Sequence, residues 1–239
     1  MTQTSIHRNS SFLKKLLPKF FWKLLRGVAT ALLTPIRFSL SSGHFQSSLK
    51  AAAVTSSGAP IPWYTYPAID FLRGRDFSQK IVLEFGGGNS SLWWALHAKR
   101  VCTFEGDLCW YSSLLEKCPK NLSLNYSPFL DTQDTCKYIR STLIENYCSE
   151  KFDIVVIDGL CRFELISLAI DYLSDDGIII CDNSEGYGFF EGFKGTSFSR
   201  IDFYGYAPGV YLPHATSIFF RLDTKFFAND IPIRVPALD

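Results

Sequence analysis

An acid followed by a run of glycines is the first group of residues that could do chemistry. Glu84 precedes Gly86, Gly87 and Gly88, and Ser90 follows them. Glycine lets the backbone turn sharply and approach a ligand closely, because it has no Cβ. A buried carboxylate at such a turn repels a pyrophosphate and attracts an ammonium group. The group therefore favours a ligand with a cationic amine over a phosphate-rich coenzyme.

A second acid, Glu105, comes about 20 residues later, at the end of the apolar run 101–104. A carboxylate at this place can accept hydrogen bonds from both hydroxyls of a ribose. S-adenosylmethionine has a ribose and an amino-acid cation but no phosphate. We therefore expect this cofactor to bind at Glu84, the glycine run, Ser90 and Glu105.

Two further apolar runs are each followed by residues with oxygen atoms in their side chains. Asp158 follows residues 152–157, and Asp182 and Asn183 follow residues 177–181. Neighbouring strands lie about 5 Å apart, so these oxygens predict a site for Mg²⁺ or another divalent cation. In the other interpretation Asp158 contacts the methionine end of the cofactor, while Asp182 and Asn183 form a turn. The sequence leaves both open, and Asp158 is in either case a candidate for the catalytic site.

His214 is the best candidate for a catalytic base by its position. It lies in a segment, residues 205–215, that is expected to be a loop beside the acids. The alternative is an ordinary loop histidine, since a single His is a weak signal. Tyr187 and His44 are weaker candidates. Aromatic residues are expected to shape the pocket of the methyl acceptor, namely Trp63, Tyr64, Tyr66 and those of residues 184–199.

These residues need a scaffold that brings distant strand ends together. Short apolar runs predict strands at residues 81–85, 101–105, 122–126, 152–158, 177–182, 200–206 and 216–222. Helices are expected between them, one of which starts after an N-cap at Asn89 or Ser90. Parallel strands with helical crossovers place all their carboxyl ends on one edge, where ligands bind. That edge would collect every candidate named above from Glu84 to His214.

With these motifs in this order, the sequence resembles the Rossmann-like (class I) S-adenosylmethionine-dependent methyltransferases. The resemblance covers residues 62–222 and rests on Glu84-x-Gly86-x-Gly88-x-Ser90, on Glu105 and on the runs that end at Asp158 and Asp182. It implies an α/β fold with a doubly wound, seven-stranded, mostly parallel sheet. In that fold strand seven lies between strands five and six and runs antiparallel.

The acids at the ends of the fourth and fifth strands also look like the metal triad of the catechol and caffeoyl-CoA O-methyltransferases. In that subgroup the metal binds neighbouring hydroxyls and lowers the pKa of the attacking one. The sequence departs from the subgroup after Asp158, since residues 159–162 lack its usual acid and lysine.

The distribution of charge divides the 239 residues into an arm and a domain. Of 24 Lys and Arg, eight lie in residues 1–69, where there is no Asp or Glu, so all 23 acids follow. We expect a basic arm and linker at residues 1–59, a methyltransferase domain at 60–225 and a tail at 226–239. Because the domain is acidic, a wide basic face for nucleic acid is not expected, and we predict no nucleic-acid partner.

The arm has an amphipathic pattern over residues 12–33, with apolar residues on one face and basic residues on the other. The run is too short and too charged to span a bilayer, and no signal peptide is expected. One interpretation is an anchor that lies on a membrane surface. The other is a helix that packs on its own domain or on a second subunit.

The sequence supports three hypotheses for function. The first is a methyltransferase that acts on a small molecule, a glycan or a lipid precursor, at oxygen or nitrogen. The second is an oxidoreductase that binds NAD(P) or a nucleotide sugar, and the third is a non-catalytic scaffold at a membrane. Seven cysteines without a C-x-x-C pair indicate reduced thiols, so we expect a cytoplasmic protein, peripheral at the inner membrane face.

Overall fold

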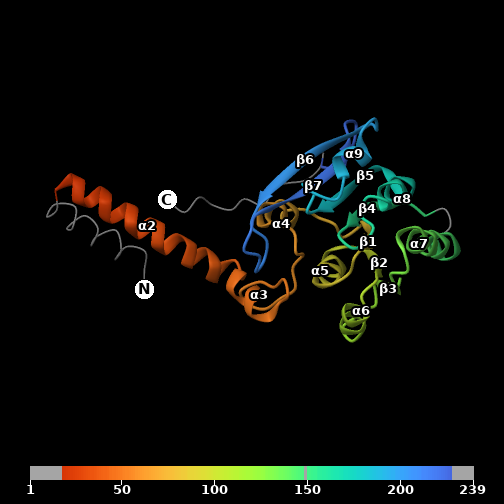
Figure 1. Cartoon of the computed structure of the whole chain (residues 1–239), viewed down its shortest axis with the longest axis horizontal. Helices are drawn as coiled ribbons and strands as arrows, with labels where there is room; N and C mark the ends of the chain where they lie inside the picture. The colour runs from red at the N-terminus through yellow and green to blue at the C-terminus, as the bar shows by residue number, and fades with distance from the viewer. Residues whose placement is uncertain (1–17, 148–149, 228–239) are drawn as a thin grey trace.

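The computed structural model describes residues 18–147 and 150–227 and has one seven-stranded sheet at its centre (Figure 1). The strand order is β3-β2-β1-β4-β5-β7-β6. All neighbouring pairs are parallel except those of β7, which runs antiparallel to β5 and to β6. The predicted fold class is therefore confirmed. The strands are β1 (Ile81–Phe85), β2 (Arg100–Glu105), β3 (Leu122–Tyr126), β4 (Phe152–Ile157), β5 (Leu173–Asp182), β6 (Phe198–Gly205) and β7 (His214–Arg221).

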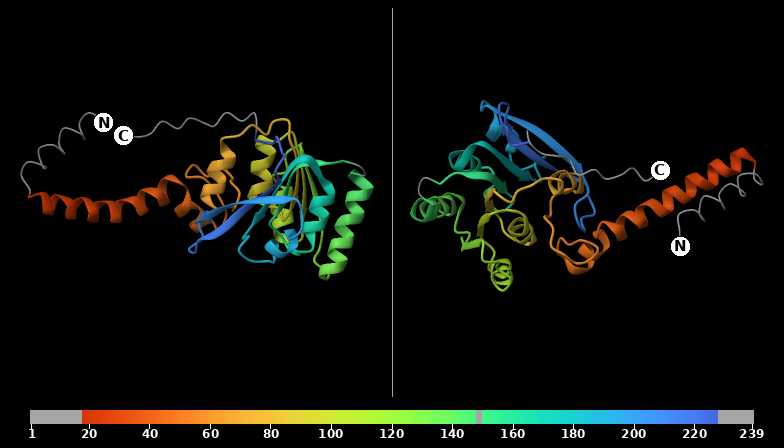
Figure 2. Two further views of the ribbon diagram at one scale, coloured as in Figure 1. Left: turned by 90° about the horizontal axis from the view of Figure 1, so that it is seen from above. Right: turned by 180° about the vertical axis from the view of Figure 1, so that it is seen from behind.

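Helices cover both faces of the sheet, so the central strands are buried on both sides (Figure 2). Alternate residues of a strand point to opposite faces. Val82 therefore packs in the core under α4, α5 and α6, and Leu83 packs in the core under α7, α8 and α9. This double burial explains the continuous apolar runs. The helices are α4 (Tyr66–Arg73), α5 (Asn89–His97), α6 (Leu108–Leu115), α7 (Thr132–Tyr147), α8 (Leu165–Tyr172) and α9 (Phe189–Phe193).

Two boundaries beside the glycine run and His214 differ from the sequence-based prediction. Gly88 is the N-cap of α5, in place of Asn89 or Ser90. The N-cap prediction was wrong because a residue inside the helix supplies the capping hydrogen bond. The hydroxyl of Ser91 accepts the N–H of Gly88 at 3.1 Å, so the cap needs no side chain of its own. His214 is the first residue of β7 and pairs with Gly205, so it does not lie in the loop as predicted.

The arm contains a long helix, α2 (Lys19–Ser41), and a short one, α3 (His44–Lys50). The amphipathic helix predicted for residues 12–33 is therefore found from Lys19 on and continues through Pro35, while residues 12–17 lie outside the described residues. No residue of α2 is buried, and the helix extends away from the sheet (Figure 2). Among the described helices, none has the length and apolar character needed to cross a membrane.

The segments next to the arm and at the C-terminal end pack on the sheet domain. Ala53 and Val54 are buried, and Val54 forms a bridge with Pro60. Phe226 belongs to the core under α4 and α5, and Phe227 packs against it. Residues 228–239 of the predicted tail lie outside the described residues, so the predicted domain boundaries stay a prediction.

Candidate functional site

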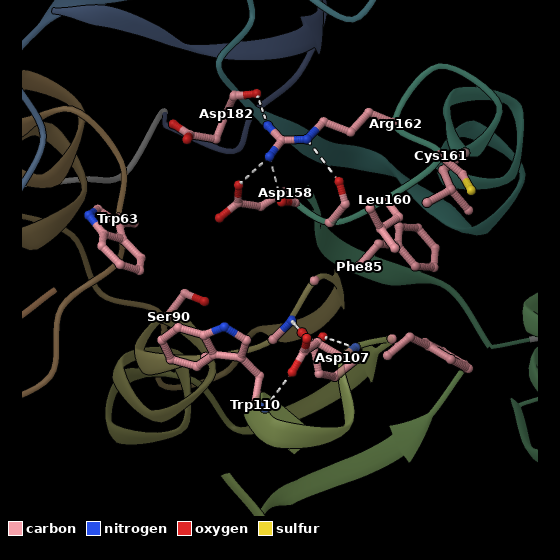
Figure 3. Close-up of a pocket in the computed structure, with 18 of the residues that line it drawn as sticks. Trp63, Phe85, Ser90, Asp107, Trp110, Asp158, Leu160, Cys161, Arg162 and Asp182 are labelled. Atoms are coloured by element: carbon pink, nitrogen blue, oxygen red, sulfur yellow. Dashed lines mark hydrogen bonds and ion pairs between the residues drawn. The ribbon is translucent and has the colours of Figure 1, made fainter. Parts of the chain in front are cut away.

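A cavity of about 700 Å³ opens at the carboxyl ends of β1, β2, β4 and β5 (Figure 3). In a sheet of parallel strands, ligands bind at this edge. Of the residues predicted to bind the cofactor or a metal, all except Glu84 line it, and so does the leading base candidate: Gly86, Gly87, Gly88, Ser90, Glu105, Asp158, Asp182, Asn183 and His214. The topology therefore brings together residues that are far apart in the sequence.

The glycine turn has two kinds of glycine. Gly86 has a φ of +96°, and a Cβ there would lie 2.4 Å from the backbone nitrogen of Gly159. Its own N–H donates to the carbonyl of Phe104 at 2.8 Å. Gly86 therefore lets the end of β1 lie against the loop after β4. Gly88 is different, because a Cβ there would meet no atom within 4 Å. This open space on the cavity wall is where a ligand can approach the backbone.

Glu84 lies under the turn and does not line the cavity. Its Oε2 accepts hydrogen bonds from the hydroxyls of Ser91 and Thr103, the latter at 2.9 Å. Since Ser91 also accepts from Gly88, Glu84 fixes the start of α5 from below. Burial raises the pKa of Glu84 to about 7, and its Oε1 has no hydrogen-bond partner among the described residues. Because Glu84 is fully buried, it cannot contact a ligand directly in this conformation, and the predicted direct contact is not supported.

Glu105 is the acid that the cavity does expose to a ligand. Its Oε2 accepts the N–H of Gly87 at 2.6 Å, and its Oε1 accepts the N–H of Asp107 at 2.6 Å. Burial raises the pKa of Glu105, and these backbone donors oppose the rise. Each carboxylate oxygen keeps a further lone pair for another donor. The carboxylate is thus held in place by the backbone and can still accept hydrogen bonds from a ligand.

Arg162 joins the ends of β4 and β5, a role that the sequence did not predict. Its Nε donates to the carbonyl of Gly159 at 2.9 Å, and its Nη2 to the carbonyl of Asp158 at 2.7 Å. Nη1 donates to the carbonyl of Asp182 at 2.5 Å and to Oδ1 of Asn183 at 3.1 Å. Nη2 also lies 3.1 Å from the Asp158 carboxylate. The guanidinium therefore neutralises part of the negative charge between the two strand ends (Figure 3).

The structure does not support the predicted metal site at Asp158, Asp182 and Asn183. The cationic group that contacts Asp158 and Asn183 is the guanidinium of Arg162. Asp182 turns its Oδ1 to the hydroxyl of Thr216, 2.6 Å away. Within residues 18–147 and 150–227, no three metal-ligating His, Cys, Asp or Glu side chains come together. One oxygen of each of these three side chains already has a partner, and Arg162 already supplies part of the positive charge that a cation would bring.

Asp158 and the buried Asp182 form an acidic pair beside a histidine. Burial raises the pKa of Asp158 well above its ordinary value, and the neighbouring Asp182 raises it further, while Arg162 opposes the rise. Burial likewise raises the pKa of Asp182 to about 6. The Nε2 of His214 lies 3.9 Å from Oδ2 of Asp182, too far for a hydrogen bond. This buried Nε2 has no hydrogen-bond partner in the part of the chain that the structure describes.

Of the aromatic residues predicted to shape the acceptor pocket, Trp63 and Tyr187 line the cavity. The indole N–H of Trp63 donates to the carbonyl of Pro208 at 2.7 Å, and its ring meets Trp110 edge to face, with 6.2 Å between centroids. Tyr64 is fully buried in the core. The indole N–H of Trp94 donates to its hydroxyl at 3.2 Å. Tyr64 therefore does not line the cavity.

Tyr66 and His44 belong to the joint between the arm and the domain. The ring of Tyr66 meets Phe38 of α2 edge to face, with 5.2 Å between centroids. The Nδ1 of His44 accepts the N–H of Gly209 at 3.3 Å. Neither side chain lines the cavity. The predicted role of Tyr66 in the acceptor pocket and the candidacy of His44 as the base are therefore not supported.

No known protein-family profile matches the chain, and no curated protein is similar to it in sequence. The solved structures that are similar to the chain include several methyltransferases. One from Geobacter sulfurreducens is 13% identical, covers 91% of this chain and 97% of its own, and has a TM-score of 0.47. An rRNA methylase from Streptococcus thermophilus is 14% identical over 66% of this chain and 97% of its own, with a TM-score of 0.45. A putative methyltransferase from Streptococcus mutans in complex with SAH is 14% identical over 63% and 94%, with a TM-score of 0.43.

The sheet order with an antiparallel β7 between β5 and β6 decides the fold class. The chain has the class I methyltransferase fold. Asp107, Trp110 and Arg162 are among the cavity residues of this methyltransferase fold that sequence reasoning missed. Asp107 had a local signal, because an acid just before a predicted helix is a common N-cap, and its Oδ1 accepts the N–H of Trp110 at 2.9 Å. Arg162 had no local signal, since its partners come from two strands.

Proposed function

We propose that this chain transfers a methyl group from S-adenosylmethionine to oxygen or nitrogen of a small-molecule, glycan or lipid-precursor acceptor. The observation that carries the proposal is the hydrogen bond between Gly87 and Glu105. It joins the glycine turn to the acid that would accept the ribose hydroxyls, and both line one cavity. The prediction of no nucleic-acid acceptor rests on the excess of acids after residue 69.

The residues present fit this cofactor. The cavity is of the size that holds a drug-sized ligand. Its apolar residues Phe104, Ile139 and Leu160 suit a purine ring. Asp158 and Asp182 bring two carboxyl groups beside the guanidinium of Arg162, so the pair keeps acceptor oxygens for an ammonium group. The missing Cβ of Gly88 leaves room for a ligand against the backbone.

The bound cofactor supplies an electrophilic methyl group, and the chain supplies alignment and a site for the released proton. In-line displacement gains most of its rate from holding the two reactants in the right geometry. The imidazole of His214 is the candidate for the proton, because His214 lines the cavity and its Nε2 has no hydrogen-bond partner among the described residues. Trp63 and Trp110 lie on the side of the cavity away from Arg162, where an acceptor can stack (Figure 3).

Isothermal titration with S-adenosylhomocysteine tests the cofactor proposal. We expect wild-type protein to bind, and Glu105→Ala to bind about tenfold to a hundredfold more weakly, because one or two charge-assisted hydrogen bonds are lost. Asp153→Ala is the matched control. Its carboxylate also accepts a backbone N–H, from Ile81 at 2.8 Å, and does not line the cavity. This control should keep wild-type affinity.

Three outcomes would contradict the proposal. Heat with NAD and none with S-adenosylhomocysteine would favour an oxidoreductase. Equal losses of affinity in Glu105→Ala and Asp153→Ala would mean that folding, and not ribose binding, explains the effect. Binding without turnover on any acceptor class would favour the non-catalytic scaffold.

The role of His214 gives a separate prediction. His214→Asn should lower kcat by about a hundredfold or more if the imidazole accepts the proton, while affinity for S-adenosylhomocysteine stays within a few-fold. An unchanged kcat in a folded His214→Asn protein would remove His214 from the mechanism.

A further inference from the structure

Helix α2 (Lys19–Ser41) has one narrow polar stripe and a wide apolar face. Its polar residues recur three or four positions apart, which places them on one side of a helix. The stripe consists of Lys19, Lys23, Arg26, Thr30, Thr34, Arg37 and Ser41. Four of these carry positive charge, and neither α2 nor the rest of residues 1–69 contains an Asp or Glu.

The apolar face of α2 is exposed in this structure. Phe20 is 72% exposed, Leu25 54% and Leu32 63%, and no residue of the helix is buried. Exposed apolar surface of this extent marks a site of interaction with a protein or a membrane. The helix lies outside the domain that carries the cavity (Figure 1), so its own fold does not use this face.

We propose that α2 lies on the surface of an anionic lipid bilayer, with its apolar face in the acyl boundary and its basic stripe among the headgroups. A helix with a cationic polar side and a wide apolar side binds in the plane of the membrane interface. Its 23 residues are about 35 Å long at the usual rise. The proposal is independent of the methyl-transfer chemistry.

Charge favours a bilayer over a second copy of the chain as the occupant. Helices that pair with one another commonly place acids opposite bases beside the apolar seam. α2 has no acid to offer to the basic residues of another α2. Anionic headgroups supply the missing negative charge, and a continuous acyl surface can cover a face wider than a two-helix seam.

The joint between α2 and the domain lets a docked helix hold the cavity at the membrane. Phe38 of α2 packs on Tyr66 of α4. The hydroxyl of Ser48, in α3, donates to the carbonyl of Gly209 at 3.3 Å. The next residue, Val210, lines the cavity. A membrane-bound α2 would therefore position the cavity wall relative to the bilayer.

Sedimentation of the full chain with vesicles tests this proposal. Vesicles of phosphatidylcholine with phosphatidylserine should carry the protein down, and pure phosphatidylcholine should bind it much less. Arg26→Gln with Arg37→Gln should weaken binding roughly fivefold for each charge removed. Leu25→Gln with Leu32→Gln should weaken it roughly a hundredfold, because two apolar side chains no longer enter the acyl boundary.

Thr30→Gln is the matched control, since it adds the same amide on the polar stripe and should bind like wild type. All variants should keep the wild-type Tm, because none of these side chains is buried. Wild-type binding by Leu25→Gln with Leu32→Gln would overturn the proposal. So would a full chain that fails to sediment with the anionic vesicles. If that chain elutes as a dimer and the two Leu substitutions convert it to a monomer, a second copy covers the apolar face.

Discussion

Gly86→Ala should lower the free energy of unfolding by about 3 kcal/mol. The φ of Gly86 is +96°, which costs an L-residue with a Cβ roughly 1–2 kcal/mol. The new Cβ would also lie 2.4 Å from the nitrogen of Gly159. This backbone cannot yield easily, because the Gly159 N–H donates to the carbonyl of Phe85 at 2.8 Å. Separating the two strand ends adds an over-packing cost of about 1–3 kcal/mol. Urea unfolding followed by circular dichroism measures the change.

Gly88→Ala is the matched control for this prediction, since it makes the same chemical change two residues away. The φ of Gly88 is 166°, extended backbone that any residue adopts, and its Cβ would meet no protein atom. Its stability should stay within about 1 kcal/mol of wild type, the range of a Gly-to-Ala change at an N-cap. Affinity for S-adenosylhomocysteine should nevertheless fall tenfold or more, because the methyl group enters the space left for the ligand. Equal stabilities of the two variants would contradict the assignment of Gly86 to the fold and Gly88 to the ligand.

The strands were predictable because of their burial on both faces. Val82 and Leu83 lie in different cores, so both must be apolar, and the run 81–85 is readable without knowing its neighbours. The predicted bounds of β3 (Leu122–Tyr126) also match, although β3 is an edge strand in which only Leu122 is buried. The ends of β6 and β7 were missed by one or two residues, because there the cross-strand pair Gly205 and His214 sets the limit.

The site was predictable where its chemistry is local and not where it depends on long-range partners. The glycine turn and Glu105 are local signals, since a strand end and a tight turn place them. The sequence also indicated to which face of the sheet the Glu84 side chain points. It shares a face of β1 with Val82, which packs under α5, so alternation along the strand points it at that helix. Arg162 was not predictable, because its partners Asp158 and Asn183 follow different strands.

Glu84→Gln should change how stability depends on pH. Burial raises the pKa of Glu84 in the folded state to about 7, from an ordinary value of 4.5. Because this pKa is raised, the folded state binds the proton more tightly than the unfolded state. The resulting stability is fully present below pH 4.5 and is lost as the pH rises through 7. The loss for the wild type is about 3 kcal/mol, and glutamine, which has no charge to bury, should avoid it.

The measurement is the difference in unfolding free energy between Glu84→Gln and wild type, from urea titrations between pH 4.5 and pH 8. Taking the difference removes the contributions of Asp158 and Asp182, whose pKa values are also raised. The stability of the variant relative to the wild type should rise between pH 4.5 and about 7 and level off above that. Thr103→Val provides a second test, since it removes a hydroxyl that donates to the Glu84 carboxylate at 2.9 Å. In Thr103→Val the pKa of Glu84 should rise further, because the carboxylate has one hydrogen-bond donor fewer. The loss of stability with rising pH should therefore extend to a higher pH in this variant.

A constant difference between Glu84→Gln and wild type at every pH would mean that Glu84 is ionised in the folded protein throughout. Its charge would then attract a cationic amine of the ligand, as the sequence indicated. In that case Glu84→Gln should weaken the binding of S-adenosylhomocysteine as much as Glu105→Ala does. If Glu84 instead acts by holding Ser91 at the start of α5, the affinity of Glu84→Gln should stay within a few-fold of wild type. The pH series and the calorimetric titration with S-adenosylhomocysteine are therefore two independent tests of the role of Glu84.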